Sequence, residues 1–361
     1  MRGGQKIPRG AYKTAIVFAL LSAVLCCLNG CALISLRGKW GYINRQGEWV
    51  VTPRFDRPPG QFRSGIAPVP MPDGWRFIDK SGRVIDALPK SDMEPFEVSD
   101  GLILCVRQNP KKHRTMLTSA DFTYVYMDTK GHSVLVPAIV TGGKFSEGLA
   151  GVQFPRGAGD TYSMWGYIDK EGKRVIDGKF FSAQAFAHGL AVVEIGARFQ
   201  GKGGAGSFVD GKFGFIDRSG QFVIKPAFRS ARAFGDNGLA VAETAYIDRT
   251  GSAVLKGPYW HAGDFSEGVA PVGTSPSSEE SKFGFIDRKG NWVAPAVWDW
   301  ADSFSEGLAG VGTNTGRFED EESRQWPIFK CGFVDRSFKL VIPQKFLAVR
   351  RFFGRAGGSR R

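Results

Sequence analysis

The side chains that could do chemistry in this 361-residue chain are either scattered or repeated, and neither arrangement suits an active site. None of the four histidines stands at the spacing of a metal-binding pair. They are His113, His132, His188 and His261. Ser–Glu pairs recur at Ser146/Glu147, Ser266/Glu267 and Ser305/Glu306. Because an active site needs one asymmetric constellation, repeated pairs are typical of structural turns. The sequence predicts no catalytic residue, no metal and no cofactor.

A glycine-rich run, residues 201–206, has a superficial likeness to a phosphate-binding loop. It lacks the Lys-Ser/Thr ending of that motif and leads into a strand pattern instead of a helix, so we interpret it as a flexible connector. Recurring Asp residues could suggest calcium, which takes roughly six to eight oxygen ligands. Each of them stands alone in a tight turn, so we interpret them as turn formers.

The first thirty residues have the order of a secretory signal. Residues 2–13 are basic with no acid, and residues 15–25 form an uninterrupted apolar run that is short for a membrane span. Leu28-Asn29-Gly30-Cys31 resembles the lipobox of bacterial lipoproteins, in which the cysteine is acylated and begins the mature chain. An ordinary signal peptide cut nearby and an uncleaved anchor are the alternatives.

We therefore expect a lipoprotein signal peptide over residues 1–30 and a lipid on Cys31. The residue after this cysteine is Ala32 and not Asp, which by resemblance to enteric sorting favours the outer over the inner membrane. Only Cys105 and Cys331 then remain in the folded body, at repeat positions that are apolar or aromatic elsewhere. We expect both to be buried, with no disulfide.

Charge sets few limits on the partner. The chain carries 48 Lys and Arg against 35 Asp and Glu, a formal charge of +13. Four of these cations lie in the leader, so the mature part carries +9. That excess fits attraction to anionic lipid, acidic polysaccharide or nucleic acid. No recognition module or concentrated basic helix accompanies the charge, so we do not expect a nucleic-acid partner.

A recurring hairpin phrase supplies the elements that position all these side chains. Counting Lys39-Trp40-Gly41-Tyr42-Ile43-Asn44 itself, the phrase occurs eight times in related forms. The acid or amide of each turn is Asn44, Asp79, Asp128, Asp169, Asp217, Asp248, Asp287 or Asp335. The acid accepts a local backbone hydrogen bond, and a Gly three residues later supplies the positive φ that a hairpin needs. The phrase predicts two short antiparallel strands.

A second half-motif, Phe-Ser-Glu-Gly-Leu-Ala-x-Val, follows most hairpins, as in residues 145–152, 265–272 and 304–311. It predicts a strand, a Gly-containing turn and another short strand. Together the half-motifs resemble the WG-repeat family of bacterial proteins over residues 36–361. The resemblance implies a β-rich repeat body, often exported and usually without assigned activity.

The predicted fold is an all-β repeat domain over residues 31–361, with about eight units of short antiparallel strands. Four strands per unit favour a propeller-like ring, and an open β-solenoid is the alternative. The chain ends help to decide. The last unit stops before its Leu-Ala-x-Val strand, while residues 32–36 supply an apolar run where such a strand would sit. A ring closed by both termini explains this complementarity.

Function is expected where the repeats differ. Insertions fall mostly between the Leu-Ala-x-Val strand and the next hairpin, and equivalent loops in a repeat array emerge on one face. The candidate interaction residues are Arg107, Lys111, Lys112, Arg114, Glu319, Asp320, Glu321 and Glu322. Loops with no partner would look similar, because insertions there cost little.

Two functional hypotheses remain. The first is a lipid-anchored binding or scaffold module that presents this face to an envelope protein or a glycan. The second is a hydrolase that acts on an envelope polymer from a central pocket of the ring. Paired carboxylates that converge on a pocket, one with a shifted pKa, would favour the enzyme.

Overall fold

The computed structural model describes residues 32–36, 39–63, 65–85, 93–108, 122–135, 137–157, 163–202, 205–257, 259–277, 280–321 and 324–349. Within these ranges every named element is a β-strand. The strands pair antiparallel, both inside hairpins and between them. The all-β repeat architecture predicted from the sequence is therefore confirmed.

Strands occupy up to four positions in a sheet, counted along the chain. The first strands are β6 (Glu94–Ser99), β10 (Thr141–Ser146), β14 (Ser182–Ala183) and β26 (Trp300–Ala301). The second strands are β1 (Ala32–Leu36), β4 (Ile66–Met71), β7 (Leu102–Gln108), β11 (Leu149–Gln153), β15 (Ala191–Ile195), β20 (Ala240–Ala242), β23 (Val269–Gly273) and β27 (Leu308–Glu321).

The recurring hairpin phrase forms the third and fourth positions. The third strands are β2 (Lys39–Ile43), β5 (Gly74–Asp79), β8 (Phe122–Asp128), β12 (Trp165–Ile168), β18 (Lys212–Ile216), β21 (Ala245–Ile247), β24 (Phe283–Asp287) and β28 (Arg324–Asp335). The fourth strands are β3 (Trp49–Phe55), β9 (Ser133–Leu135), β13 (Arg174–Phe180), β19 (Phe222–Phe228), β22 (Ala253–Leu255), β25 (Trp292–Trp298) and β29 (Leu340–Val349). An extra hairpin, β16 (Arg198–Lys202) and β17 (Ala205–Val209), is inserted between β15 and β18.

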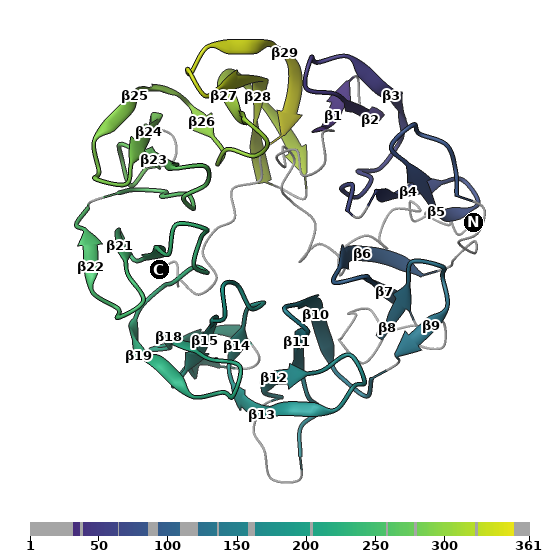
Figure 1. Cartoon of the computed structure of the whole chain (residues 1–361), viewed down its shortest axis with the longest axis vertical. Helices are drawn as coiled ribbons and strands as arrows, with labels where there is room; N and C mark the ends of the chain where they lie inside the picture. Colours follow the sequence, from purple (N-terminus) through teal and green to yellow (C-terminus); the bar gives the residue numbers. More distant parts are fainter. Residues whose placement is uncertain are drawn as a thin grey trace, which may run out of the picture.

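The sheets stand side by side around a circle, with the first strands toward the centre and the fourth strands on the rim (Figure 1). The last strand, β29, lies beside the first sheet, β1–β3. This is the propeller-like ring favoured by the sequence, and the open solenoid is not what forms.

Most outer turns, which join a third strand to a fourth, are built by an Asp and a Gly; the first has Asn44 in place of Asp, and the last has Phe338, with φ 59°, in place of the expected Gly. In the β18–β19 turn, Asp217 Oδ1 accepts the Ser219 N–H at 2.9 Å and the Gln221 N–H at 3.0 Å. Gly220 adopts φ +82°, a region in which only glycine is unstrained. The turn chemistry predicted from the repeated phrase is confirmed.

The glycine of the Trp-Gly or Phe-Gly pair is required for a different reason than the turn glycine. A side chain at Gly214 would place its Cβ 2.7 Å from the Ile224 carbonyl oxygen of the neighbouring fourth strand. The register between β18 and β19 shifts at this point, between Phe213 and Phe215. The phrase therefore keeps glycine so that the two backbones can approach closely.

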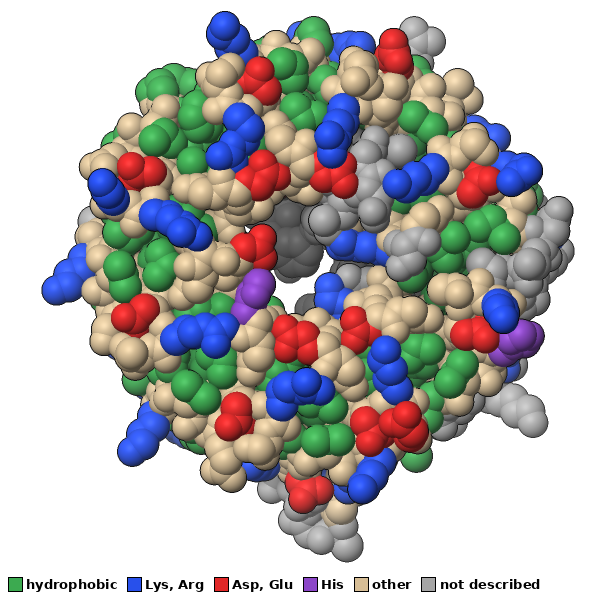
Figure 2. All heavy atoms as spheres, viewed as in Figure 1, with side chains coloured by type: hydrophobic (Ala, Val, Ile, Leu, Met, Phe, Trp, Pro, Cys, Tyr) green, Lys and Arg blue, Asp and Glu red, His purple; other side chains and the backbone are tan. Residues whose placement is uncertain are grey.

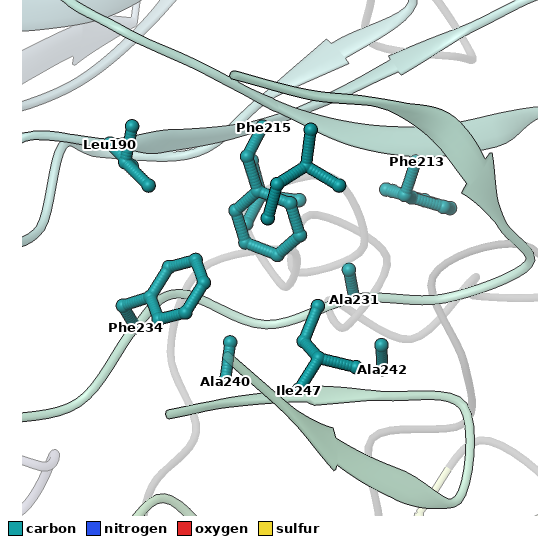
Figure 3. Packing of buried hydrophobic residues seen from close by; sticks show 10 residues of the cluster. Leu190, Phe213, Phe215, Ala231, Phe234, Ala240, Ala242 and Ile247 are labelled. Carbon is teal, nitrogen blue, oxygen red and sulfur yellow. The ribbon is translucent and has the colours of Figure 1, made fainter. Parts of the chain in front are cut away.

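The hydrophobic core lies between neighbouring sheets and forms a series of shared clusters. Figure 3 shows one of them, in which Phe215 and Leu190 of one sheet face Phe234 and Ile247 of the next. The rings of Phe215 and Phe234 are 4.9 Å apart and tilted by 56°. No unit buries its apolar face alone, so each one depends on its neighbours.

In four of the hairpins a buried tyrosine forms a hydrogen bond to the segment that leads into the next sheet. Each donates its phenol O–H to a backbone carbonyl 17 or 18 residues later. The pairs are Tyr42 to Gly60 (2.6 Å), Tyr126 to Gly143 (2.7 Å), Tyr167 to Gln184 (2.7 Å) and Tyr246 to Gly263 (2.8 Å). Burial raises the pKa of Tyr126, Tyr167 and Tyr246, so all three stay neutral donors.

The N-terminal strand takes the place predicted for it. Ala32 of β1 pairs with Ile43 of β2, as Ala150 of β11 pairs with Ile168 of β12. β1 therefore stands where the Leu-Ala-x-Val strand stands in the other sheets. The first sheet receives its second strand from the start of the chain, as the complementary ends suggested.

The boundary between the last and first sheets is packed like the others. Ile43 shares a core cluster with Phe333 and Ile342 of the last sheet. The rings of Trp49 and Phe346 meet edge to face at 5.9 Å. The ring is thus closed by the same apolar contacts that join sheets adjacent in sequence.

Cys105 and Cys331 are buried and free, at 2% and 1% exposure. Burial raises the pKa of the Cys105 thiol to about 12, so this group stays protonated. Both fill core positions, as the repeat alignment predicted.

The outer-turn glycine gives a test of the contact between units. A Cβ at Gly220 would lie 2.9 Å from Ile176 Cγ2 of the preceding sheet, whereas at Gly189, with φ +81°, nothing lies within 4 Å. Gly189→Ala should cost about 1–2 kcal/mol, from its backbone conformation alone. Gly220→Ala should cost about 1–3 kcal/mol more, because it overpacks the boundary. Urea unfolding of both variants measures the difference, and equal losses would contradict the role of the boundary.

Candidate functional site

The inserted segments all join a second strand to a third. They follow β7, β11, β15, β23 and β27, and each leads into the third strand of the same sheet. In an antiparallel sheet this connection lies at the edge opposite the two turns. The insertions therefore share one face of the ring, which we call the loop face. The other, with the inner and outer turns, is the turn face.

The predicted interaction residues lie in two different sheets. Arg107 is exposed near the end of β7, and Lys111, Lys112 and Arg114 fall outside the described residues. Glu319, Asp320 and Glu321 end β27, where their backbones pair with residues 326, 325 and 324, and Glu322 is outside the described residues. Cys31 is outside them as well. Their roles in binding stay predictions.

Two insertions form ordered hairpins. The β27–β28 hairpin continues past the core, through a register shift between Asn314 and Phe318, to its acidic end. The glycine-rich run belongs to the β16–β17 ladder, where Gly201 pairs with Gly206. This differs from the flexible connector expected from composition, because the flanking residues pair as strands and carry the glycines with them.

The inner turns, which join first and second strands, are linked to one another around the turn face. In three of them an acid with positive φ accepts the glycine N–H of the next inner turn. The contacts are Asp100 from Gly148 (2.8 Å), Glu147 from Gly189 (3.0 Å) and Glu267 from Gly307 (3.0 Å). The φ angles of these acids are 51°, 53° and 52°. A non-glycine residue there is strained, so the contact offsets part of that strain.

At three inner turns a basic residue from the next outer turn adds a second contact. Lys170 donates to the Asp100 carbonyl oxygen at 2.8 Å, and Arg249 donates to that of His188. Arg336 donates to the Glu267 carbonyl oxygen in the same way. We call this arrangement, an inner-turn acid or His with the cation of the next unit, the boundary link.

The boundary link also joins the two ends of the ring. Arg45 of the first outer turn donates to Glu306 of the last inner turn at 2.6 Å, across 261 residues of sequence. In one inner turn His188 stands in place of the acid, and the Nε2 atom of this histidine lies 3.2 Å from Asp236 Oδ1 of the next unit. The Ser–Glu–Gly turns were visible in the sequence, but the residues that contact them in the next unit were not. The only sign of these contacts was the cation that recurs after the turn Asp, and it does not say which residue it contacts.

The turn carboxylates are held in their charged form. Hydrogen bonds, led by that from the Ser219 hydroxyl, lower the pKa of Asp217. The pKa values of Asp248 and Asp335 are lowered in the same way, by the hydroxyls of Thr250 and Ser337. These acids are turn formers, as predicted, and their lone pairs face their own backbone instead of a ligand.

The described residues contain no group of three or more His, Cys, Asp or Glu side chains placed to hold a metal. Ser146 Oγ donates to the Phe186 carbonyl oxygen at 2.7 Å, so a structural bond occupies this hydroxyl. Burial raises the pKa of Glu94, a half-buried residue of β6, and Arg57 opposes that shift.

Charge is mixed over the surface. Figure 2 shows one face of the ring, hollowed at its middle, with acidic and basic side chains interspersed over it. The ion pairs Arg45–Glu306 and Arg336–Glu267 leave their guanidinium side chains half exposed. The described residues of the face in this view therefore carry charges of both signs.

Four segments of the chain match the family model described as WG containing repeat. They are residues 40–69, 165–199, 213–244 and 283–314. Each match begins at the aromatic residue of a third strand. The resemblance is thus confirmed for these four repeats. No curated protein matches the chain.

Several solved structures are similar to this chain. Apo AztD from Citrobacter koseri has a TM-score of 0.45 and 12% identity, over 86% of this chain and 92% of that one. Puromycin hydrolase has a TM-score of 0.42 and 11% identity, over 90% of this chain and 54% of that one. A protein of unknown function from Bacteroides caccae has a TM-score of 0.26 and 11% identity, over 86% and 91%.

No helix of the described residues has the length and apolarity that a membrane crossing requires.

The turn carboxylates predict a loss of stability in acid. Their pKa is lowered on folding, so their contribution is complete above the unfolded value, about 3.9, and is lost as the pH falls through the lower folded value. In the first outer turn, Asn44 Oδ1 already accepts from the Gln46 and Glu48 N–H groups at 3.0 Å. Asn at positions 217, 248 and 287 should therefore keep the turns and flatten the acid loss.

Urea midpoints of the wild type and of the triple Asp→Asn variant, measured from pH 7 to about pH 3, test this prediction. The two curves should converge as the pH falls. Curves that stay parallel would show that the turn carboxylates do not titrate differently in the folded and unfolded chains.

Proposed function

We propose that this protein is an exported, lipid-anchored scaffold of about eight WG repeats. Its loop face binds an envelope protein or a glycan, and it has no catalytic activity. The lipid is attached to Cys31, and the outer membrane is its location. Four matched repeats and the recurrence of the phrase through the rest of the chain support this extension of the family to residues 31–361.

The observation that carries the binding role is the contrast between the two faces. On the turn face, short turns are joined by boundary links, so their residues are taken up by the ring itself. On the loop face, the connections range from a short turn between β4 and β5 to the long β27–β28 hairpin. Variable loops on a rigid scaffold are where binding residues concentrate.

A binding role also suits the chemistry of the loops. Arg107 near the end of β7 is basic, whereas the end of β27 is acidic over residues 319–321. Opposite charges on different loops of one face favour recognition of a partner with matching charges over capture of any polyanion.

Site-specific photocrosslinking in cells tests the loop face. A photoreactive amino acid at Arg317, exposed at the loop end of β27, should yield a crosslinked partner. The matched control is Glu171, exposed in an outer turn, which should yield less of that product or none. Equal yields from both faces, or none from several loop positions, would contradict the binding role.

The lipid anchor is tested by Cys31→Leu. By repeat position Cys31 corresponds to Leu149, so leucine fits the sequence pattern while it removes the thiol that would carry the lipid. The variant should fold like the wild type but leave the membrane fraction. Flotation of both proteins with bacterial membranes measures this, and a variant that floats like the wild type would contradict lipid attachment.

A further inference from the structure

We propose that the lipid on Cys31 holds the ring with its turn face against the bilayer, so that the loop face points away from the membrane. The inference rests on the lipid anchor of the proposed function and adds the surface that meets the lipid. The occupant of the turn face is a phospholipid bilayer.

The direction of β1 decides which face is near the anchor. Its first residue, Ala32, pairs with Ile43, and the outer turn Asn44–Gly47 follows Ile43 directly. Its last residue, Leu36, pairs with Lys39 at the opposite end of β2. The N-terminal end of β1 therefore lies at the turn face.

No spacer separates the anchor from the fold. Cys31 precedes Ala32 by one peptide bond, about 3.8 Å between Cα atoms. In the other sheets the equivalent residue directly follows an inner turn, as Leu149 follows Gly148 and Leu308 follows Gly307. Cleavage before Cys31 removes the residues that would form such a turn in the first sheet. The acylated residue then begins the chain one residue before β1, whose first residue lies at the turn face.

The thickness of the ring makes the two faces distinguishable. A second strand of five residues, such as β23, spans about 17 Å at ~3.3 Å per residue. The headgroup boundary that holds interfacial side chains is only about 5–10 Å deep. A bilayer in contact with one face therefore leaves the other in water.

The turn face also carries side chains that suit phosphate headgroups. In seven outer turns a cation directly follows the turn acid or amide; these are Arg45, Lys80, Lys170, Arg218, Arg249, Arg288 and Arg336. Neighbouring carboxylates accept backbone N–H groups, as Asp217 and Glu147 do. Because Arg45 and Arg336 stay about half exposed within their boundary links, they can contact headgroups without breaking them.

Two labelled variants of the mature acylated protein, which lacks residues 1–30, test this orientation. Lys289→Cys places a probe in the outer turn after β24, and Glu280→Cys places one in the loop before β24, so both replace an exposed charged residue of one unit. Cys105 and Cys331 are buried, so a fluorescent maleimide reacts with the new, exposed thiol. Each protein is reconstituted in vesicles of phosphatidylethanolamine and phosphatidylglycerol.

The probe at 289 should lose quenching by aqueous iodide and gain quenching by lipids spin-labelled on the headgroup. The probe at 280 should show the opposite pattern. Equal quenching of both probes would overturn the proposal in favour of an unpaired β1 that acts as a tether, and the reverse pattern would overturn it directly.

The same labels on the Cys31→Leu background keep this result separate from the anchor. Both probes should then be open to iodide. Protection of 289 in that soluble protein would overturn the proposal, because a protein and not the bilayer would cover the turn face. If Cys31→Leu floats like the wild type, the lipid anchor itself fails, and this orientation is overturned with it.

Discussion

Each unit of this protein has an apolar face that only the next unit can cover. Each hydrophobic cluster therefore lies between two neighbouring sheets, as the one with Phe215 and Phe234 does. A row of such units leaves an uncovered apolar face at each end unless the last unit packs against the first. Here it does, through the contact of Trp49 with Phe346 and the ion pair of Arg45 with Glu306. Closure is the constraint from which the rest follows, including the use of the N-terminus as a strand in the first sheet.

Closure of the ring also gives the turn face and the loop face different roles. Inner-turn residues such as Glu147 hold a left-handed backbone conformation that an ordinary residue avoids, and the glycine N–H of the next turn offsets part of that strain. Substitution on this side disturbs a boundary between units. The connections from second to third strands do not hold neighbouring units together in this way, so they can be longer, as in the β27–β28 hairpin. A partner that binds there meets residues that the fold does not need.

Local chemistry made much of the fold predictable. The spacing from Asp217 to Gly220 specifies a turn by itself, and the missing and extra strands at the chain ends pointed to a ring. The boundary links were missed because Glu147 and Lys170 act on residues of other units, and no local pattern states which unit lies beside which. The hairpin around Gly201 was missed because composition does not reveal strand pairing. The candidate interaction residues, among them Lys111, differ between units, so no recurring pattern indicates what they do.

The position of β1 has a consequence for the order of events during synthesis. β1 and β2 are among the first strands made, but the sheet beside them is completed only when β29 emerges, about 300 residues of chain later. Contacts of such sequence separation form slowly, and until they form, an unpaired boundary stays exposed to other chains. The ring therefore cannot close before its last strand has been made, and folding ends when the final sheet packs against the first.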